Sequence, residues 1–305
     1  MTIALIDGDI LAFRTAAAAQ ETWDGEVIVD VNKAIRDVDV AYREWIKWVK
    51  PNKTIIAFSD PGRTYFRHYV DPNYKNNRAH LERPQALTAI IAYIKDKFEC
   101  MSRPGLEADD LLGWLATNPA VPDPVIVTLD KDLQTIPGKW MNPTKLRRPL
   151  KINPRAADAN WLTQTLTGDT TDGYKGCPGI GPKRAEALLS ATPVFREQWA
   201  LVERAFIDAG LDTAEAIKQA RLARILRFTD YKEETGEIKL WHPKEEIWLK
   251  WSEVQDTIVK APPKLPTTSS PSSETSQETK PGVSATSSST SADTETSTPK
   301  RRKRT

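Results

Sequence analysis

The sequence predicts an α/β fold with a central, mainly parallel sheet flanked by helices. Short apolar runs rich in β-branched residues have the pattern of strands buried in a parallel sheet; they are TIALI (2–6), TIIAF (54–58) and VIVTL (125–129). Helical patterns lie between them, at 32–49 and 84–99. Because strand and helix alternate along the chain, we expect parallel pairing with helices on both faces of the sheet.

Composition divides the 305 residues into three regions. We expect residues 1–156 to form the α/β core and residues 157–261 to be helical, because strand patterns stop near residue 157. Residues 262–305 are rich in Ser, Thr and Pro and end in KRRKR. Such a segment buries too little apolar surface to offset its ordering entropy, so we expect a disordered tail. Its basic end could bind DNA or act as a nuclear-import-like cluster, but we favour a solvated tail.

Residue usage narrows the kinds of site that the chain can form. It has two cysteines, Cys100 and Cys177, which make no disulfide framework and suit a reducing cytoplasm. The three histidines are scattered, which argues against a His-rich zinc or iron site. A metal site would therefore consist of oxygen ligands, which favour Mg²⁺ or Mn²⁺. The sequence contains no apolar run long enough to span a membrane, so we expect no membrane partner.

Acidic residues occur where predicted strands end and helices begin. Asp7, Asp60 and Asp130 each follow a predicted strand, and the carboxyl ends of parallel strands meet at one edge of a sheet. Glu107 and Asp110 are three residues apart at a helix start, so they share a face. The other candidates are Asp109, Asp132, Asp169 and Asp172. Gathered carboxylates repel one another, and two divalent ions would neutralise them and suit phosphodiester hydrolysis.

Each acidic residue also has a structural explanation. Asp60 precedes Pro61-Gly62 and could be a turn residue. Glu107 and Asp109 suit a helix N-terminus, and Asp169 could be an N-cap. The sequence leaves Asp9 open as a metal ligand, a partner of a ligand or a turn residue.

Three segments are candidates for binding a nucleic-acid backbone. Residues 168–189 contain Gly179-Ile-Gly181, then Pro182, Lys183 and Arg184, which is typical of a helix-hairpin-helix but also fits an ordinary tight turn. Residues 71–78 place Lys75 and Arg78 where they could bind the scissile phosphate, with Tyr74 stacking on a base; a solvated basic loop is the alternative. Residues 221–228 would put Arg221, Arg224 and Arg227 on one helical stripe, either following a phosphate backbone or solvated.

These motifs, in this order, resemble the 5′-nuclease family, which includes flap endonucleases and the 5′-nuclease domains of bacterial DNA polymerases. The resemblance covers residues 1–190 through LIDGD, AFSD, DPNYKNNR, GLEADDLL, TLDKD and GDTTDGYKGCPGIGPKRA. With RLARILRF and EIKLWHP it extends to about residue 245 and is closer to the 5′→3′ exonucleases of short-tailed lytic phages. It implies a PIN-like core fold.

The resemblance also implies roles for individual residues. The first metal position would be formed around Asp7, Asp60, Glu107, Asp109 and Asp110. The second would be served by Asp130, Asp132, Asp169 and Asp172. Lys75 and Arg78 would act with Asp130 in catalysis near the scissile phosphate. The hairpin would bind DNA through Gly179, Gly181, Lys183 and Arg184, and its carbonyls could hold K⁺.

The implied activity is divalent-metal-dependent 5′→3′ exonuclease action on duplex DNA with 5′ ends, releasing 5′-phosphorylated products. RNA in RNA–DNA hybrids is a further implied substrate. The implied partner is a single-stranded DNA binding protein or the replication machinery. The implied location is the host cytoplasm if the gene is phage-borne. The short stretch from Arg78 to Glu107 favours duplex ends over flap threading. The alternatives are a structure-specific 5′ flap endonuclease, a toxin-like ribonuclease without the helix-hairpin-helix, and a non-catalytic DNA-end binding protein.

Overall fold

A six-stranded sheet with the order β5-β4-β1-β6-β7-β8 forms the centre of the protein. The computed structural model describes residues 1–260, so the predicted tail at 262–305 lies outside the described residues. The strands are β1 (Ile3–Asp7), β4 (Lys53–Ala57), β5 (Cys100–Met101), β6 (Pro124–Val127), β7 (Gly138–Met141) and β8 (Leu150–Ile152). Neighbours pair in parallel except β7 and β8, which are antiparallel. The predicted mainly parallel sheet is confirmed.

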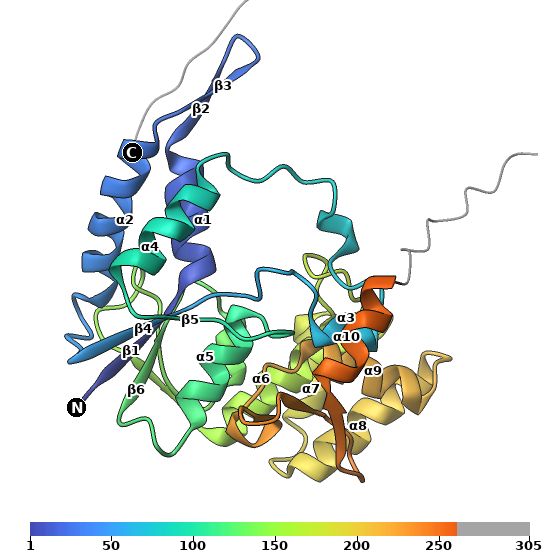
Figure 1. Ribbon diagram of the computed structural model, residues 1–305. Helices are drawn as coiled ribbons and strands as arrows, with labels where there is room; N and C mark the ends of the chain where they lie inside the picture. Colours follow the sequence, from blue (N-terminus) through green and yellow to red (C-terminus); the bar gives the residue numbers. More distant parts are fainter. Residues whose placement is uncertain (261–305) are drawn as a thin grey trace, which may run out of the picture. The chain divides into compact units, whose positions relative to one another are not determined.

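Helices cover both faces of this sheet (Figure 1). Alternation along β1 directs Ala4 and Ile6 to one face, where they pack with α1 (Gly8–Ala18), α2 (Val31–Ile46) and α4 (Leu87–Lys97). Ile3 and Leu5 point to the other face and pack with α5 (Ala108–Thr117). The helices predicted at 32–49 and 84–99 are α2 and α4.

The second half of the chain is mostly helical and continues from the sheet. Its helices are α6 (Pro154–Thr167), α7 (Pro182–Leu189), α8 (Phe195–Asp208), α9 (Thr213–Ala223) and α10 (Trp251–Lys260). Short helices complete the chain: α3 (Phe66–Val70), η1 (Asn76–Arg78), η2 (Asp132–Thr135) and η3 (Phe228–Asp230). The described residues lie within one compact unit, and a domain division between 156 and 157 stays a prediction.

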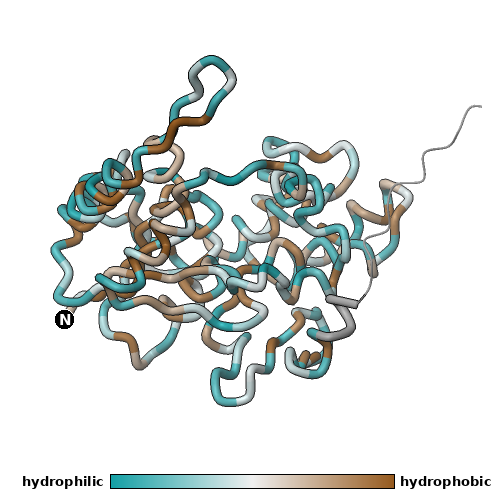
Figure 2. The backbone as a smooth tube through the Cα atoms, turned by 45° about the horizontal axis from the view of Figure 1, so that its top comes forward, coloured by the Kyte–Doolittle hydropathy of each residue, from teal (hydrophilic) through white to brown (hydrophobic). Residues whose placement is uncertain are grey.

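The expectation that strands stop near residue 157 is wrong. A three-stranded antiparallel sheet follows α9, made of β9 (Tyr231–Lys232), β10 (Glu237–Leu240) and β11 (Ile247–Lys250). These strands are two to four residues long, so their alternation of buried and exposed positions is too short to detect in the sequence. The sequence also did not predict the hairpin of β2 (Gln20–Trp23) and β3 (Glu26–Val29). This hairpin projects at the top of Figure 2 and exposes Trp23 and Ile28.

The predicted arginine stripe at 221–228 is also wrong. Helix α9 ends at Ala223, and the chain continues in an extended conformation through Arg224. Arg224 is buried and pairs with Asp230 at 2.7 Å, while Arg227 pairs with Asp158 at 2.7 Å. These two guanidinium groups form ion pairs within the fold. They do not form a stripe on one helix, because α9 ends before both of them.

No helix among residues 1–260 is long and apolar enough to cross a membrane.

The packing of α5 depends on Gly113. A Cβ at this position would lie 2.4 Å from the carbonyl oxygen of Leu226 and 2.8 Å from Ile136 Cδ1. The segment after α9 therefore contacts the α5 backbone directly.

We expect Gly113→Ala to destabilise the protein by about 1–3 kcal/mol, because the gain in helix propensity is smaller than the cost of overpacking against backbone. Chemical denaturation measures this change. Gly181→Ala is the comparison variant, since a Cβ there meets no atom within 4 Å and the only expected cost is a poorer N-cap for α7. Equal stability of the two variants would contradict the close approach.

Candidate active site

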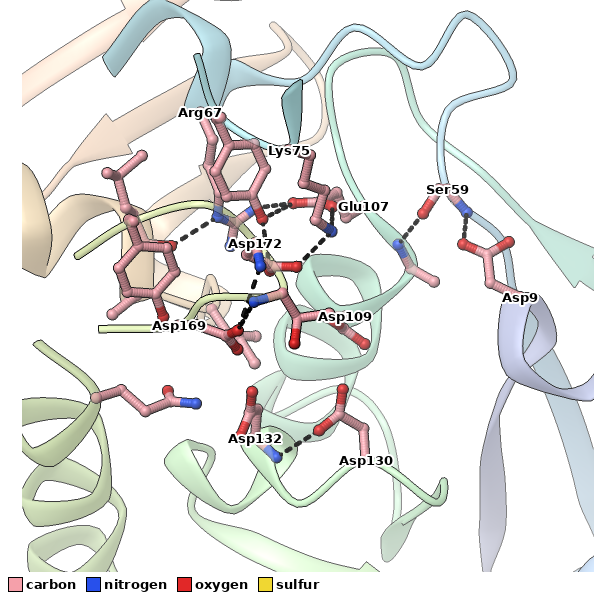
Figure 3. A pocket seen from close by; sticks show the side chains of 18 of the residues that line it. Asp9, Ser59, Arg67, Lys75, Glu107, Asp109, Asp130, Asp132, Asp169 and Asp172 are labelled. Carbon is pink, nitrogen blue, oxygen red and sulfur yellow. Dashed lines mark hydrogen bonds and ion pairs between the residues drawn. The ribbon is translucent and has the colours of Figure 1, made fainter. Parts of the chain in front are cut away.

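A pocket of about 370 Å³ opens beyond the carboxyl end of the parallel sheet. It is lined by acidic side chains from three parts of the chain: the sheet edge, the start of α5, and the loop after α6 (Figure 3). The acidic residues that line it are Asp7, Asp9, Glu107, Asp109, Asp130, Asp132, Asp169 and Asp172. Acidic residues from strand ends and from the start of α5 therefore converge in one pocket. The sequence predicted this for all of the acidic lining residues except Asp9, which it left open.

Asp7 is the last residue of β1 and caps α1. Its Oδ1 accepts a hydrogen bond from the Ile10 backbone N–H at 3.0 Å, and its Oδ2 accepts one from the Thr128 hydroxyl at 2.8 Å. Burial, together with the nearby carboxylates of Asp9 and Asp130, raises the pKa of Asp7 to about 7. A negative charge at this position is therefore costly without a cation.

Asp130 and Asp132 follow β6 and share one side of the pocket (Figure 3). The Asp132 backbone N–H donates to Asp130 Oδ1 at 2.8 Å. Burial, then the charge of Asp130, raises the pKa of Asp132 to about 6. Burial also raises the pKa of Asp109 well above its ordinary value, with Asp7 and Asp130 adding to the shift.

Basic side chains lie on the opposite side of the pocket. Lys75 Nζ forms an ion pair with Glu107, and Arg78 Nη2 lies 2.7 Å from Asp172 Oδ1. Burial alone would raise the pKa of Glu107, but Lys75 and Arg67 outweigh it and lower the pKa to about 2. Asp172 differs, because burial outweighs its two cations and raises its pKa. Positive charge therefore compensates only one part of the acidic cluster.

The loop between α6 and α7 supplies Asp169 and Asp172. Asp169 and Tyr174 exchange backbone hydrogen bonds, and Asp169 Oδ1 accepts from the Thr171 and Asp172 N–H groups. Gly168 has a φ of +67°, and a Cβ there would lie 2.4 Å from the Lys175 backbone. Asp169 thus closes this tight loop and does not cap a helix.

Asp60 and Asp110, which the sequence predicted as members of the metal-binding set, do not line the pocket. Both oxygens of Asp60 accept backbone N–H groups, from Gly62 at 2.9 Å and Gly105 at 2.8 Å. Asp110 is fully buried and forms a two-pronged ion pair with Arg67 at 2.7 and 2.8 Å. The spacing correctly put Glu107 and Asp110 on one face, but the cation that they share is a guanidinium.

Tyr74 is also placed differently from the prediction. Its ring is buried, and its hydroxyl lies 3.0 Å from both Glu107 Oε2 and Asp172 Oδ2. Tyr74 lines the pocket, but it is only 4% exposed, too little for a base to stack on its ring. Tyr74 instead links the start of α5 to the loop after α6.

Asp9, Ser59 and Arg67 lie at the site, although the sequence left Asp9 open and gave no reason to choose the other two. The Asp9 Oδ2 accepts the Ser59 backbone N–H at 3.2 Å, and the Ser59 hydroxyl accepts the Ala108 N–H at 2.9 Å. Burial raises the pKa of Asp9. An arginine inside the apolar stretch YFRHYV was the one available signal for Arg67.

The predicted hairpin precedes α7 with the expected local chemistry. Pro182 is at the first helical position and Gly181 is the N-cap. Gly179 has a φ of +74°, which favours glycine, and its carbonyl accepts from Arg184 Nη1 at 3.3 Å. Lys183 and Arg184 are exposed, so their charge is available to a ligand.

Sequence comparison links the chain to known nucleases. The profile of the family described as "5′-3′ exonuclease, N-terminal resolvase-like domain" matches residues 2–153. The exodeoxyribonuclease of Enterobacteria phage T3 is 30% identical over 290 residues, covering 79% of this chain and 93% of the relative. The exonuclease of Escherichia phage T7 is 30% identical over 284 residues, with the same coverage.

Solved structures agree at the level of the fold. The 5′-exonuclease of phage T5 with bound zinc ions has a TM-score of 0.52 and 17% identity, covering 73% of this chain and 89% of that one. The T5 flap endonuclease in a complex with DNA and metal ions has a TM-score of 0.51 at the same identity and coverage. The profile match and the phage relatives show that the chain belongs to the 5′-3′ exonuclease family.

Proposed function

We propose that this protein hydrolyses phosphodiester bonds from the 5′ ends of duplex DNA, using divalent metal ions held in the acidic pocket. One observation carries the proposal: the pocket collects carboxylates that the protein's own cations do not neutralise. Among the described residues, no lysine or arginine forms an ion pair with Asp7, Asp9, Asp109, Asp130 or Asp169. Burial, and after it the charge of neighbouring carboxylates, raises the pKa values of Asp7 and Asp132.

These donors fit hard divalent cations. Carboxylate oxygens are the ligands that Mg²⁺ prefers, and we propose Mg²⁺ as the physiological ion with Mn²⁺ as a substitute. Within residues 1–260 no three Asp, Glu, His or Cys side chains are already gathered as a ready-made metal centre.

We assign the ligands by their place in the pocket. Asp7, Asp109 and Glu107, with Asp9 beside them, would hold one ion; Asp130, Asp132, Asp169 and Asp172 would hold the other. Bound ions of this kind activate water and stabilise the charge that develops on a phosphate. Water would attack the phosphorus and the 3′ oxygen would leave, so the products carry a 5′ phosphate.

The basic side of the pocket would orient the scissile phosphate. Glu107 raises the pKa of Lys75 although burial opposes this, so the ammonium group stays protonated. Arg78 lies beside it and is half-exposed. Both groups can turn from their carboxylate partners toward a phosphate once metal ions neutralise those partners.

A second cavity of about 690 Å³ adjoins the active site under the segment that joins α3 to α4. Lys75 and Arg78 line both cavities, and Arg14, Arg63 and Arg83 line the second. Its positive charge suits the 5′ end of the strand being cut.

A digestion panel of blunt duplex, 5′ flap and RNA–DNA hybrid would show which of these substrates the site accepts.

We propose that the hairpin before α7 grips the DNA backbone without recognising sequence. Gly179 and Gly181 allow close approach of the backbone, and Lys183 and Arg184 add charge. The hairpin carbonyls could also hold K⁺. A single-stranded DNA binding protein or replication machinery as partner, and a location in the host cytoplasm, stay predictions.

Asp130→Asn should lower the turnover number for 5′-labelled duplex by about 100-fold or more in Mg²⁺, because a ligand charge is lost from the reacting centre. Asp123→Asn is the matched control, since Asp123 precedes the same strand and pairs with Lys139 at the surface. Equal product release by Asp130→Asn and the unsubstituted protein would rule out the assignment.

Metal-free protein should lose stability as pH rises from about 4 to 7. Asp7 titrates near 7 and Asp132 near 6 in the folded state, against 3.8 ordinarily, so the folded protein binds more protons than the unfolded chain in this window. The free energy of unfolding therefore falls with rising pH. Thermal unfolding in a chelator at pH 5 and pH 8 measures this.

Asp7→Asn should stabilise the metal-free protein at pH 8, because it removes a buried charge. Each kcal/mol gained in the free energy of unfolding should raise Tm by about 2–4 °C. The same substitution should abolish the stabilisation of the protein by Mg²⁺. A Tm that is equal at both pH values and unchanged by this substitution would contradict the role of buried charge.

Replacing Lys183 and Arg184 by Ala should weaken duplex binding in a chelator and reduce the slope of log K against log salt by about 1–2. Binding is measured without divalent ions so that no cleavage occurs. Lys47→Ala with Lys50→Ala is the control, because Lys47 is the C-cap of α2 and Lys50 follows it, away from the hairpin (Figure 1). If both double variants bind duplex DNA with the same affinity, the hairpin does not bind the DNA backbone.

A further inference from the structure

A single buried hydroxyl connects the acidic ends of two neighbouring strands. Thr128 directly follows β6, and its side chain is fully buried. Its Oγ1 donates a hydrogen bond to Asp7 Oδ2 at 2.8 Å and accepts one from the Asp130 backbone N–H at 3.0 Å. The hydroxyl therefore contacts both acidic residues, one through the side chain and the other through the backbone.

This contact completes a chain of hydrogen bonds along the sheet edge. Asp7 Oδ1 is already held by the Ile10 N–H, so the Thr128 hydroxyl fixes the second oxygen and with it the orientation of the carboxylate. On the other side, Asp130 Oδ1 accepts the Asp132 N–H, so anchoring the Asp130 backbone also places Asp132. One hydroxyl thus sets how carboxylates from β1 and from the loop after β6 lie relative to each other.

We propose that Thr128 is a positioning residue for divalent-cation binding, acting through Asp7 and Asp130. The inference rests on the proposed function, because it assumes that these carboxylates hold metal ions. Carboxylates that repel one another spread apart unless something fixes them, and hydrogen bonds from groups behind the ligands hold them at a constant spacing. Thr128 does not line the pocket, so it acts through the ligands.

Three variants separate this role from ordinary packing. Thr128→Val keeps the branched shape and removes the hydroxyl, while Thr128→Ser keeps the hydroxyl and removes the methyl group. Thr15→Val is the control, because Thr15 is also buried but its hydroxyl bonds only to the carbonyls of Leu11 and Ala12 within its own helix.

Mn²⁺ binding to each full-length protein is measured by the loss of the free-ion electron paramagnetic resonance signal. Nuclease activity is followed in parallel against Mg²⁺ concentration, and Tm is recorded in a chelator so that binding is compared where every variant is folded. We expect Thr128→Val to raise the Mn²⁺ dissociation constant and the Mg²⁺ concentration for half-maximal activity by about 10- to 100-fold. Thr128→Ser and Thr15→Val should bind Mn²⁺ nearly as the unsubstituted protein does.

Unchanged Mn²⁺ affinity in Thr128→Val, beside an unsubstituted protein that binds and cleaves, overturns the positioning role and leaves the proposed function intact. Equal weakening by Thr15→Val overturns it as well, because loss of any buried hydroxyl would then have the same effect. An unsubstituted protein that neither binds Mn²⁺ nor cleaves DNA refutes the proposed function, and the inference with it.

Discussion

Uncompensated negative charge at the carboxyl edge of the sheet is the constraint on which the site depends. Parallel pairing brings Asp7 and Asp130 to the same edge, and α5 adds Asp109. Burial removes the water that would otherwise solvate them, and the pKa values of Asp7 and Asp109 rise in response. The folded protein therefore holds mutually repelling carboxylates at this edge, and the divalent cations proposed above would relieve that repulsion.

Arg67 explains why the repulsion is confined to one side of the pocket. Its guanidinium pairs with Glu107 and Asp110, and its remaining N–H groups donate to the carbonyls of Leu222 and Arg224. The same side chain therefore neutralises the start of α5 and ties it to the segment after α9. Removing one member of such a buried group leaves another charge unpaired, which is strongly destabilising.

The helical half of the protein supplies part of the acidic pocket. The loop that carries Asp169 and Asp172 comes from this half, and Arg78 and Asn77 hold it through the carbonyls of Thr170 and Thr171. Its position also depends on Gln219 of α9, whose side-chain oxygen accepts the Gly176 N–H. The proposed DNA-binding hairpin and the proposed metal site thus lie on adjoining segments of one packed unit.

Periodicity in the sequence by itself determined the parallel sheet, the helices α2 and α4, and the convergence of Asp7 and Asp130, because strand direction fixes which ends meet. It also determined the Pro182 helix start, which is a local signal. Only the tertiary structure decided which carboxylates face the pocket. Asp110 pairs with Arg67, and Asp60 accepts hydrogen bonds from two backbone amides, whereas Asp9 lines the pocket. Spacing places residues on a face, but the partner across that face comes from a distant segment, and local pattern carries no information about it.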